Sequence, residues 1–266
     1  MTSEEVQAVL TEREFVATYN LKQYDYSWQP IEQYQDVQQY HERYPEKGST
    51  AVSNALELPR GRVHGWLEGG KPDQVKGLEF GRKHGWFGQG WNSDVGRAFN
   101  ILVAAAFAGG TIGDRDLTPR FTLGKGYENE IVAAIERLTG ESKVVEDSRY
   151  PGTQEVIPVS GQMPLGRALV ALGAPRGAKN SDSEMALPSY LDRGPEQIRE
   201  NFIRLYIQFR AVNRPNNTYL VIREERPDSY IDELTGFLNR ELPGEVYRKS
   251  SIVIPYEAAD SLGISY

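Results

Sequence analysis

The feature that most constrains the fold is an internal similarity between two segments about a hundred residues apart. The segments are NILVAAAFAGGTI at Asn100–Ile112 and NFIRLYIQFRAV at Asn201–Val212. Aligned on their asparagines, they place Gly109 opposite Arg210, an offset of 210 − 109 = 101 residues. Internal repetition on this scale predicts a pseudo-dimer within one chain, with the equivalent helices meeting at a pseudo-twofold axis.

The elements predicted around the two segments follow the same order. The hydrophobic pattern predicts a helix, a hairpin, a helix, a second hairpin and a closing helix in each half. In the first half the helices are expected at 94–108, 128–139 and 164–172, and the strands near 111–113, 120–123, 142–147 and 155–159. In the second half the helices are expected at 195–210, 229–242 and 256–262, and the strands at 218–223 and 246–254.

The N-terminal region, residues 1–92, is predicted to be helical. An amphipathic helix is expected at 3–19, and Pro30 opens another that runs to Tyr44. Ser49 or Thr50 caps a short helix, the turn lies at residues 58–59, and a second short helix follows to about 67. This pattern indicates a helix-turn-helix over about 30–70. A helical hairpin with a solvated basic face is the alternative.

One more helix is expected at 72–85, and the glycine-rich segment 88–94 marks the predicted domain boundary.

The composition limits the chemistry of the chain. It has no cysteine, which excludes disulfides, thiolate catalysis and cysteine-bound zinc. Its histidines, His41, His64 and His84, are too scattered to predict a metal cluster, so we expect no metal and no cofactor. No segment has the ~18 continuous apolar residues of a membrane span. The acidic start of the chain lacks a signal-peptide pattern, so we expect a cytoplasmic, nucleoid-associated protein with no membrane partner.

The charge of the chain is acidic, with 37 Asp and Glu against 30 Lys and Arg and a formal net charge of −7. DNA binding would therefore require a local basic surface. Arginine outnumbers lysine by 21 to 9. Low lysine with abundant acids is similar to the composition of proteins from salt-adapted archaea, and an ordinary acidic composition is the alternative explanation.

The paired segments and the linker between them resemble a known protein family. The linker, residues 174–194, lies within a stretch that reads LGAPRGAKNSDSEMALPSYL at Leu172–Leu191 and continues into PEQIRENFIRLYIQFRA. This stretch and the two segments resemble the LAGLIDADG homing endonucleases from about residue 94 to the C-terminus. In the second segment Arg204, Tyr206 and Ile207 match the family pattern. The departures are Leu205, Gln208, Phe209, Arg210 and Ala211.

The resemblance implies an α+β fold in which an all-α helix-turn-helix domain, residues 1–92, precedes a duplicated αββαββα domain, residues 93–266. The two repeats would span 93–173 and 195–266. This order of domains looks like that of archaeal regulators related to the bacterial sporulation factor WhiA, with the domain order reversed. We further expect Leu205 and Phe209 to fill the space opposite Ala104 and Ala108 in the helix pair.

The resemblance also implies that the chain has lost its nuclease activity. In the family, the last acidic residue of each paired helix holds the divalent metal. Here those positions are Gly109 and Arg210. Glycine offers no ligand and arginine repels a divalent ion, so we expect no catalytic residue and no enzymatic activity. Arg210 is instead expected to contact a backbone phosphate, with an intramolecular ion pair as the alternative.

The family's strands form a concave saddle that enters the major groove, which predicts double-stranded DNA as the partner. In the N-terminal domain, the helix-turn-helix would present exposed positions on its second helix, with Gly61 and Gly65 allowing close approach to base edges. The candidate contact residues are Thr50, Arg60, Arg62, His64, Arg115, Arg120, Lys125, Arg149, Arg210, Arg214, Arg223, Arg226, Arg248 and Lys249. Lys143 is a further candidate. The acidic helices 128–139 and 228–242 would face away from the DNA.

These observations favour a sequence-specific DNA-binding protein that acts as a transcriptional regulator, either as a monomer or as a homodimer, and that contacts the transcription machinery. Two alternatives stay open. One is an active endonuclease of the LAGLIDADG type. The other is a protein-interaction scaffold that does not bind DNA. The target sequence and the direction of regulation do not follow from the residues.

Overall fold

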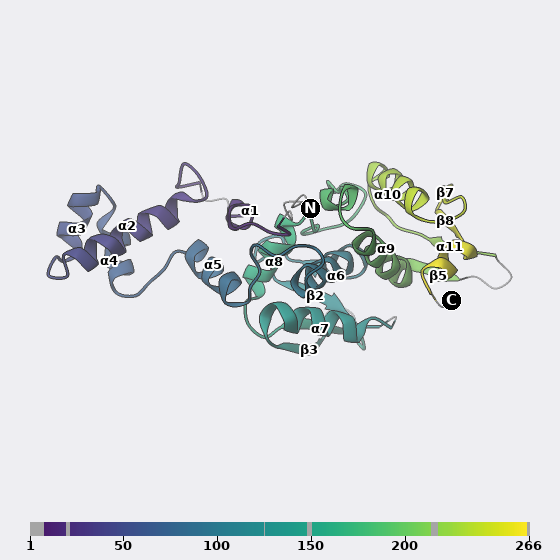
Figure 1. Cartoon of the computed structure of the whole chain (residues 1–266), viewed down its shortest axis with the longest axis horizontal. Helices are drawn as coiled ribbons and strands as arrows, with labels where there is room; N and C mark the ends of the chain where they lie inside the picture. Colours follow the sequence, from purple (N-terminus) through teal and green to yellow (C-terminus); the bar gives the residue numbers. More distant parts are fainter. Residues whose placement is uncertain (1–7, 20–21, 125, 148–150, 214–217, 265–266) are drawn as a thin grey trace, which may run out of the picture. The chain divides into compact units, whose positions relative to one another are not determined.

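The computed structural model describes residues 8–19, 22–124, 126–147, 151–213 and 218–264. The chain divides into two compact units, a smaller one at Thr11–Lys83 and a larger one at His84–Tyr266 together with the first ten residues (Figure 1). The division therefore comes before the glycine-rich segment 88–94. The reason is that Trp86 already belongs to the core of the larger unit: its indole donates to the carbonyl of Leu138 at 2.8 Å and packs edge-on against Phe99.

The described residues of the smaller unit form helices and loops, with no strand. Its helices are α1 (Glu12–Ala17), α2 (Gln29–Arg43), α3 (Ser49–Leu56), α4 (Arg60–Leu67) and α5 (Asp73–Lys83). The single helix expected at 3–19 is wrong at its start, because Val9 and Leu10 are buried but not helical. Helix α1 instead begins after Thr11, which forms a capping box with Glu14.

Helices α2, α3 and α4 enclose a small core of their own. Val37, Val52, Val63 and Trp66 are its buried members, with partly buried tyrosines and leucines around them. The turn between α3 and α4 is held by Ser53, whose hydroxyl donates to the carbonyl of Leu58 at 2.6 Å. The three helices predicted over 30–70 are therefore confirmed as elements. The predicted cap is corrected, because α3 begins after Gly48 with no side-chain cap.

The larger unit is mixed α+β and contains two four-stranded antiparallel sheets. Its first run of elements is α6 (Asp94–Ala108), β1 (Thr111–Ile112), β2 (Pro119–Thr122), α7 (Glu128–Thr139), β3 (Ser142–Glu146), β4 (Gln154–Pro158) and α8 (Gln162–Ala171). After the 3-10 helix Ser189–Asp192, the second run is α9 (Glu196–Arg210), β5 (Ala211–Asn213), β6 (Tyr219–Ile222), α10 (Asp228–Glu241), β7 (Tyr247–Arg248), β8 (Ile252–Pro255) and α11 (Tyr256–Ser261).

The two runs share one order of elements and one order of strands. The sheets are ordered β1-β2-β4-β3 and β5-β6-β8-β7. Two details of the second run differ from the sequence prediction. Strand β5 follows α9 directly, and the expected continuous strand 246–254 is a hairpin of β7 and β8, closed by a bond from the amide of Lys249 to the carbonyl of Ser251 at 3.0 Å.

Helices α6 and α9 lie side by side at the centre of the larger unit (Figure 1). Nearly every residue of α6 from Val95 onward is buried, which explains its small apolar composition. Asn100 links the two helices, because its amide donates to the carbonyl of Ile198 at 2.9 Å and accepts from the hydroxyl of Tyr190 at 2.8 Å. None of the helices in the described part of the chain has the length and apolar character needed to cross a membrane.

Candidate nucleic-acid interface

The ends of the paired helices carry no acidic residue. Helix α6 ends at Ala108 with Gly109 as its C-cap, and helix α9 ends at Arg210, so the two positions expected to carry metal ligands, Gly109 and Arg210, lie at the ends of the paired helices. Residues 109–110 separate α6 from β1, whereas α9 passes straight into β5.

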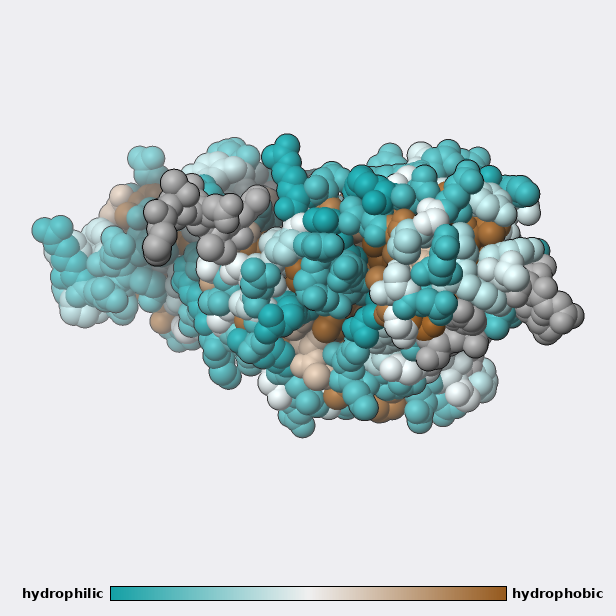
Figure 2. All heavy atoms as spheres, turned by 45° about the vertical axis from the view of Figure 1, so that its right-hand side comes forward, coloured by the Kyte–Doolittle hydropathy of each residue, from teal (hydrophilic) through white to brown (hydrophobic). Residues whose placement is uncertain are grey.

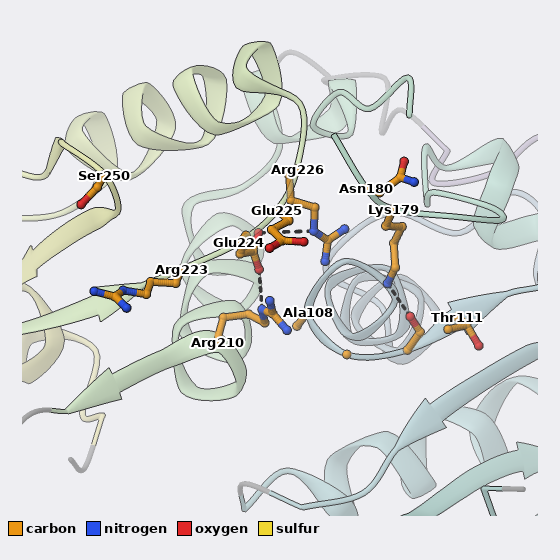
Figure 3. A pocket seen from close by; sticks show the side chains of 12 residues that line it. Ala108, Thr111, Lys179, Asn180, Arg210, Arg223, Glu224, Glu225, Arg226 and Ser250 are labelled. Atoms are coloured by element: carbon orange, nitrogen blue, oxygen red, sulfur yellow. Dashed lines mark hydrogen bonds and ion pairs between the residues drawn. The ribbon is translucent and has the colours of Figure 1, made fainter. Parts of the chain in front are cut away.

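Both helix ends border one surface hollow of about 850 Å³ (Figure 3). Four cationic side chains line it, and two carboxylates lie among them. The lining charges are Lys179, Arg210, Arg223, Arg226, Glu224 and Glu225. Arg210 and Arg226 point toward Glu224, whereas Arg223 points away from this cluster. The hollow is therefore cationic on balance.

Glu224 is the buried centre of this cluster. Its side chain has no exposed surface, and it accepts hydrogen bonds from Nε of Arg210 and, at 2.5 Å, from the hydroxyl of Tyr206. Nε of Arg226 lies 3.5 Å from the carboxylate. Burial, together with Tyr230 and the carboxylate of Glu224, raises the pKa of Tyr206 well above its usual value. Tyr206 therefore stays a hydrogen-bond donor, and the buried carboxylate is fully bonded.

Cations also cap the end of α6. Nζ of Lys179 donates to the carbonyls of Ala106 and Gly110 at 2.6 and 2.5 Å, and Nη2 of Arg226 donates to the carbonyl of Phe107 at 3.1 Å. Carbonyls at a helix end lack partners within the helix and carry partial negative charge, so cations suit them. Burial, and then the charges of Arg226 and Arg210, lowers the pKa of Lys179 to about 7.

The geometry at Gly109 leaves little room for a metal ligand. A β-carbon added there would lie 3.1 Å from Cδ1 of Phe209, which is closer than ordinary contact. Among the described residues, no group of three or more His, Asp or Glu side chains is arranged to hold a metal ion. The hollow can therefore attract anions through Arg223 and the free donors of Arg210 more readily than it can hold a divalent cation.

The faces of the second sheet follow from its strand register, because directly opposed residues point to the same side. Arg248 opposes Ile252, and its guanidinium bonds to Asp228 and Asp232 of α10. The side of the sheet that carries Arg248 is therefore covered by α10. The other side carries Val212, which is 55% exposed, and Val221 and Val253, which are buried. Lys249, at the end of β7, lies over the ring of Tyr247.

The open side of the first sheet carries polar and charged residues. Phe121 and Val156 oppose one another and are fully buried, so the alternating residues Arg120 and Thr122 lie on the open side. Arg120 is 3.5 Å from the buried carboxylate of Glu155 while keeping 43% of its side chain exposed. This face therefore presents a cation that is partly neutralised.

The outward face of helix α4 includes two residues without side chains. Arg60, His64 and the two glycines Gly61 and Gly65 are exposed, while Val63 and Trp66 point inward. Added β-carbons at the two glycines would meet nothing within 4 Å. Glycine costs about 1 kcal/mol relative to alanine inside a helix, so packing within the protein does not account for either residue.

The structure separates the sequence-predicted contact residues into four groups. Those exposed and without an ion pair to another described residue are Thr50, Arg60, His64, Arg115, Arg223 and Lys249. Those bound to other groups of the protein yet still partly exposed are Arg62, Arg120, Arg210 and Arg248. The one that is buried is Arg226. Those outside the described residues are Lys125, Arg149 and Arg214.

Three of these predictions need correction. Arg226 is not available to DNA, because it is buried between Glu224 and the end of α6. Arg248 faces the helix-covered side of its sheet. Arg62 is turned toward α2, where it bonds to Gln33 at 2.7 Å and lies over the ring of Tyr24. In each case a nearby acceptor or ring that is distant in sequence holds the guanidinium.

Sequence reasoning missed Lys179 and Glu224. Lys179 belongs to the linker and Glu224 follows a strand, where single charged residues carry no periodic signal. Both were placed next to the helix ends by tertiary packing. The one signal available for Lys179 was its position in the linker stretch that resembles the family.

Comparisons with known proteins assign no family to the chain. No family model matches the chain, and no curated protein matches it.

Proposed function

We propose that this protein binds double-stranded DNA sequence-specifically, as a transcriptional regulator, and does not cut it. Helices α3 and α4 would act as a helix-turn-helix, with α4 in the major groove. The larger unit would act as a second, saddle-shaped DNA-binding module of the LAGLIDADG type. Two linked modules raise each other's effective concentration, so modest affinities combine into useful specificity.

The observation that carries the proposal is the outward face of α4. The short helix α4 has two glycines at exposed positions, next to Arg60 and His64, and no contact within the protein requires them. A helix that must approach base edges closely gains from missing side chains, and arginine suits guanine and phosphate. DNA binding therefore accounts for a cost in helix stability that packing leaves unexplained.

The LAGLIDADG arrangement is proposed for the larger unit on two grounds. The element order αββαββα occurs twice with the same strand order, and the first helices of the two runs lie side by side. Absence of cleavage is proposed because Gly109, packed against Phe209, and Arg210 stand where a carboxylate pair would be needed. Appearance of cut ends in a DNA library incubated with Mg²⁺ would favour the endonuclease alternative.

Substitution of Gly65 by alanine tests the proposal, because it should raise the stability of the protein and lower its affinity for DNA. The methyl group has open space within the protein, so the free energy of unfolding of the smaller unit should rise by about 1 kcal/mol. Affinity for duplexes selected by the wild-type protein from a randomised library should fall, because the methyl group meets the base edges. The measurements are urea unfolding and fluorescence anisotropy.

Gly236→Ala in α10 is the matched control. Gly236 is also exposed with nothing within 4 Å of an added β-carbon, but it lies in α10 of the larger unit, outside the proposed helix-turn-helix. This variant should gain similar stability and keep its affinity. If the wild-type protein selects no sequence, or if Gly65→Ala binds as tightly as the wild type, the role of α4 is wrong.

A further inference from the structure

Strand β3 is an edge strand of the first sheet, and its outer side pairs with no other strand in the described part of the chain. The sheet is ordered β1-β2-β4-β3, and the five residues of β3 make it the longest edge strand of either sheet (Figure 1). Such an edge presents a row of unpaired main-chain groups that can pair with another strand.

The hydrogen bonds beside β3 show which of its residues face outward. The amide of Asp147 donates to the carbonyl of Thr153 at 2.8 Å. The amide of Val159 donates to the carbonyl of Glu141 at 3.1 Å. Bonding to the partner strand alternates along an antiparallel ladder, so the odd-numbered residues of this strand direct their main-chain groups toward β4. The residues whose amides and carbonyls point away from the sheet are therefore Ser142, Val144 and Glu146.

The middle residue of β3 is an exposed valine. Val144 is 51% exposed, although it opposes Val156, which is fully buried on the helix-packed side of the sheet. Helix α7 reaches this side at Ser142, whose hydroxyl donates to Glu136 at 3.0 Å, but it leaves Val144 uncovered. On the face shown in Figure 2, hydrophobic residues occur only as small separate patches among hydrophilic ones. The outer edge of β3 thus combines an uncovered apolar side chain with unpaired main-chain groups.

We propose that β3 pairs antiparallel with β3 of a second copy of this chain, with Val144 opposite Val144 on a twofold axis. The two four-stranded sheets would then form one continuous sheet. Each outward-pointing residue meets an outward-pointing residue of the other copy, which gives about six main-chain hydrogen bonds. The two valines cover one another across the axis. This inference goes beyond the proposed function and does not depend on DNA binding.

The side chains of β3 select this register. Opposed residues share a side of a sheet, so the twofold axis must pass through a residue position. An axis at Lys143 would place two lysines face to face, and like charges directly opposite one another are destabilising. An axis at Val145 would place Val144 opposite the carboxylate of Glu146. The axis at Val144 avoids both conflicts, because Lys143 then lies opposite Val145, and Ser142 lies opposite Glu146 at the solvent-exposed ends.

The charges of β3 favour a second copy over an unrelated strand. Lys143 lies near the start of the strand and Glu146 at its end, and both are exposed. Antiparallel pairing brings the basic end of each copy beside the acidic end of the other, although the two side chains leave opposite faces of the sheet. The same sequence therefore supplies both members of a complementary pair, which an arbitrary strand does not.

Charge variants at Val144 test the twofold register in the full chain without DNA. Sedimentation velocity should show a wild-type dimer whose fraction rises with concentration, over a series that reaches roughly 0.5 mM, because one five-residue edge makes a small interface. Val144→Lys and Val144→Glu should each raise the dissociation constant about tenfold or more, since like charges replace two apolar side chains that cover one another. A 1:1 mixture of the two variants should recover the dimer, because opposite charges then meet on the axis.

Val212→Lys and Val212→Glu are the matched controls. Val212 is also an exposed valine on an edge strand, at 55% in β5 of the second sheet. Both variants should keep the wild-type dissociation constant, alone and mixed.

Hydrogen exchange of the wild type gives a readout that needs no variant. The outward amides of Val144 and Glu146 should exchange more slowly as the protein concentration rises. The amide of Val145, which faces β4, should show no such dependence on concentration.

Three outcomes would overturn the inference. The first is a wild-type chain that stays monomeric over the whole series. The second is a dimer that the variants at Val212 weaken as much as those at Val144. The third is a dimer in which mixing Val144→Lys with Val144→Glu restores nothing and the exchange of the outward amides does not depend on concentration, because Val144 then does not face its own copy. Each of these outcomes leaves the proposed DNA binding in place.

Discussion

At the scale of single residues, the buried carboxylate of Glu224 organises the hollow at the helix ends. It holds Arg210 and Arg226, which come from different elements, and it accepts a hydrogen bond from Tyr206. A buried charge is tolerated here because the carboxylate accepts hydrogen bonds from Arg210 and Tyr206 and lies 3.5 Å from Arg226. The same bonds explain why Arg226 serves the protein interior rather than a ligand.

Glu224→Gln should destabilise the protein strongly. The substitution keeps the shape of the side chain and removes its charge, which leaves the guanidinium of Arg226, 6% exposed, without compensation. We expect the free energy of unfolding to fall by about 3 kcal/mol, as for other buried pairs that lose one partner. Urea denaturation measures the change.

Glu225→Gln is the control for that variant. Glu225 is adjacent and exposed, and it forms no ion pair with the described residues. Its substitution should alter stability by less than about 0.5 kcal/mol. Equal effects of the two substitutions would show that the burial of Glu224 does not matter.

Lys179 should give the protein a stability that rises with pH. Burial and two neighbouring guanidinium groups lower its pKa to about 7 in the folded state, against an ordinary value of 10.5 in the unfolded chain. Between these values the unfolded state binds more protons, so the free energy of unfolding increases with pH. Below about pH 7 both states are protonated and the trend from this residue ends. The neutral amine still has two N–H donors for the two carbonyls.

The test is urea unfolding of the wild type and of Lys179→Met at about pH 7 and about pH 9. Between these two pH values, the free energy of unfolding of the wild type should rise more than that of Lys179→Met. Lys143→Met removes a lysine at an exposed strand position and should retain the wild-type trend. Parallel trends in the wild type and Lys179→Met would contradict the argument.

At the scale of elements, the close contact of α6 with α9 depends on small residues in α6. Ala104, Ala105 and Ala108 are buried, and the ring of Phe209 lies against Gly109. Small residues on one helix and large ones on the other can fill the space between two helices at normal packing density, so the expectation that Leu205 and Phe209 lie opposite Ala104 and Ala108 stays a prediction. The contact therefore tolerates departures from the small-residue pattern in α9.

Ala104→Leu should disrupt this contact. The added atoms have no space at a residue with no exposed surface, and overpacking of this kind costs roughly 1–3 kcal/mol. Thermal unfolding should show a lower Tm. Ala133→Leu, on the exposed side of α7, provides the same substitution in a helix without the packing effect and should leave Tm almost unchanged. An unchanged Tm for Ala104→Leu would mean that the two helices are not closely packed there.

At the scale of the whole molecule, the separation of charges reconciles a net charge of −7 with the proposed DNA binding. In the second sheet, acids of α10 neutralise Arg248, while Arg223 and Lys249 are exposed and have no ion pair with a described residue. Local groups of such cations can attract DNA although the net charge of the chain is negative.

The salt dependence of DNA binding should distinguish the exposed Arg223 from Arg248, which is paired with carboxylates of α10. Affinity for a selected duplex should fall with salt, with a slope of ~0.9 for each phosphate that the protein neutralises. Arg223→Ala should reduce the slope by about 1, whereas Arg248→Ala should leave it unchanged, because its guanidinium is bonded to two carboxylates of α10. Anisotropy titrations at several salt concentrations measure both. A larger change for Arg248→Ala would reverse the assignment of the two faces.

Most of the helices and strands are predicted in the right order from the residues alone. Hydrophobic periodicity and caps are local properties, so helices such as α6 and α7 were predicted at their observed bounds. The absence of a carboxylate at the ends of α6 and α9 was also evident from the residues alone. Short elements were missed where pairing partners distant in the chain define them, as in β5 and in the β7–β8 hairpin.

The contacts of each charged residue depend on how the chain packs in three dimensions. Arg210, Arg223 and Arg226 are all predicted to contact DNA, and the sequence does not distinguish them. In the structure Arg210 is bonded at the rim of the hollow, Arg223 is exposed and Arg226 is buried. The difference depends on whether Glu224 or a helix-end carbonyl lies within hydrogen-bonding distance. The bond from Arg226 to the carbonyl of Phe107 joins residues 119 positions apart, and no local pattern encodes it.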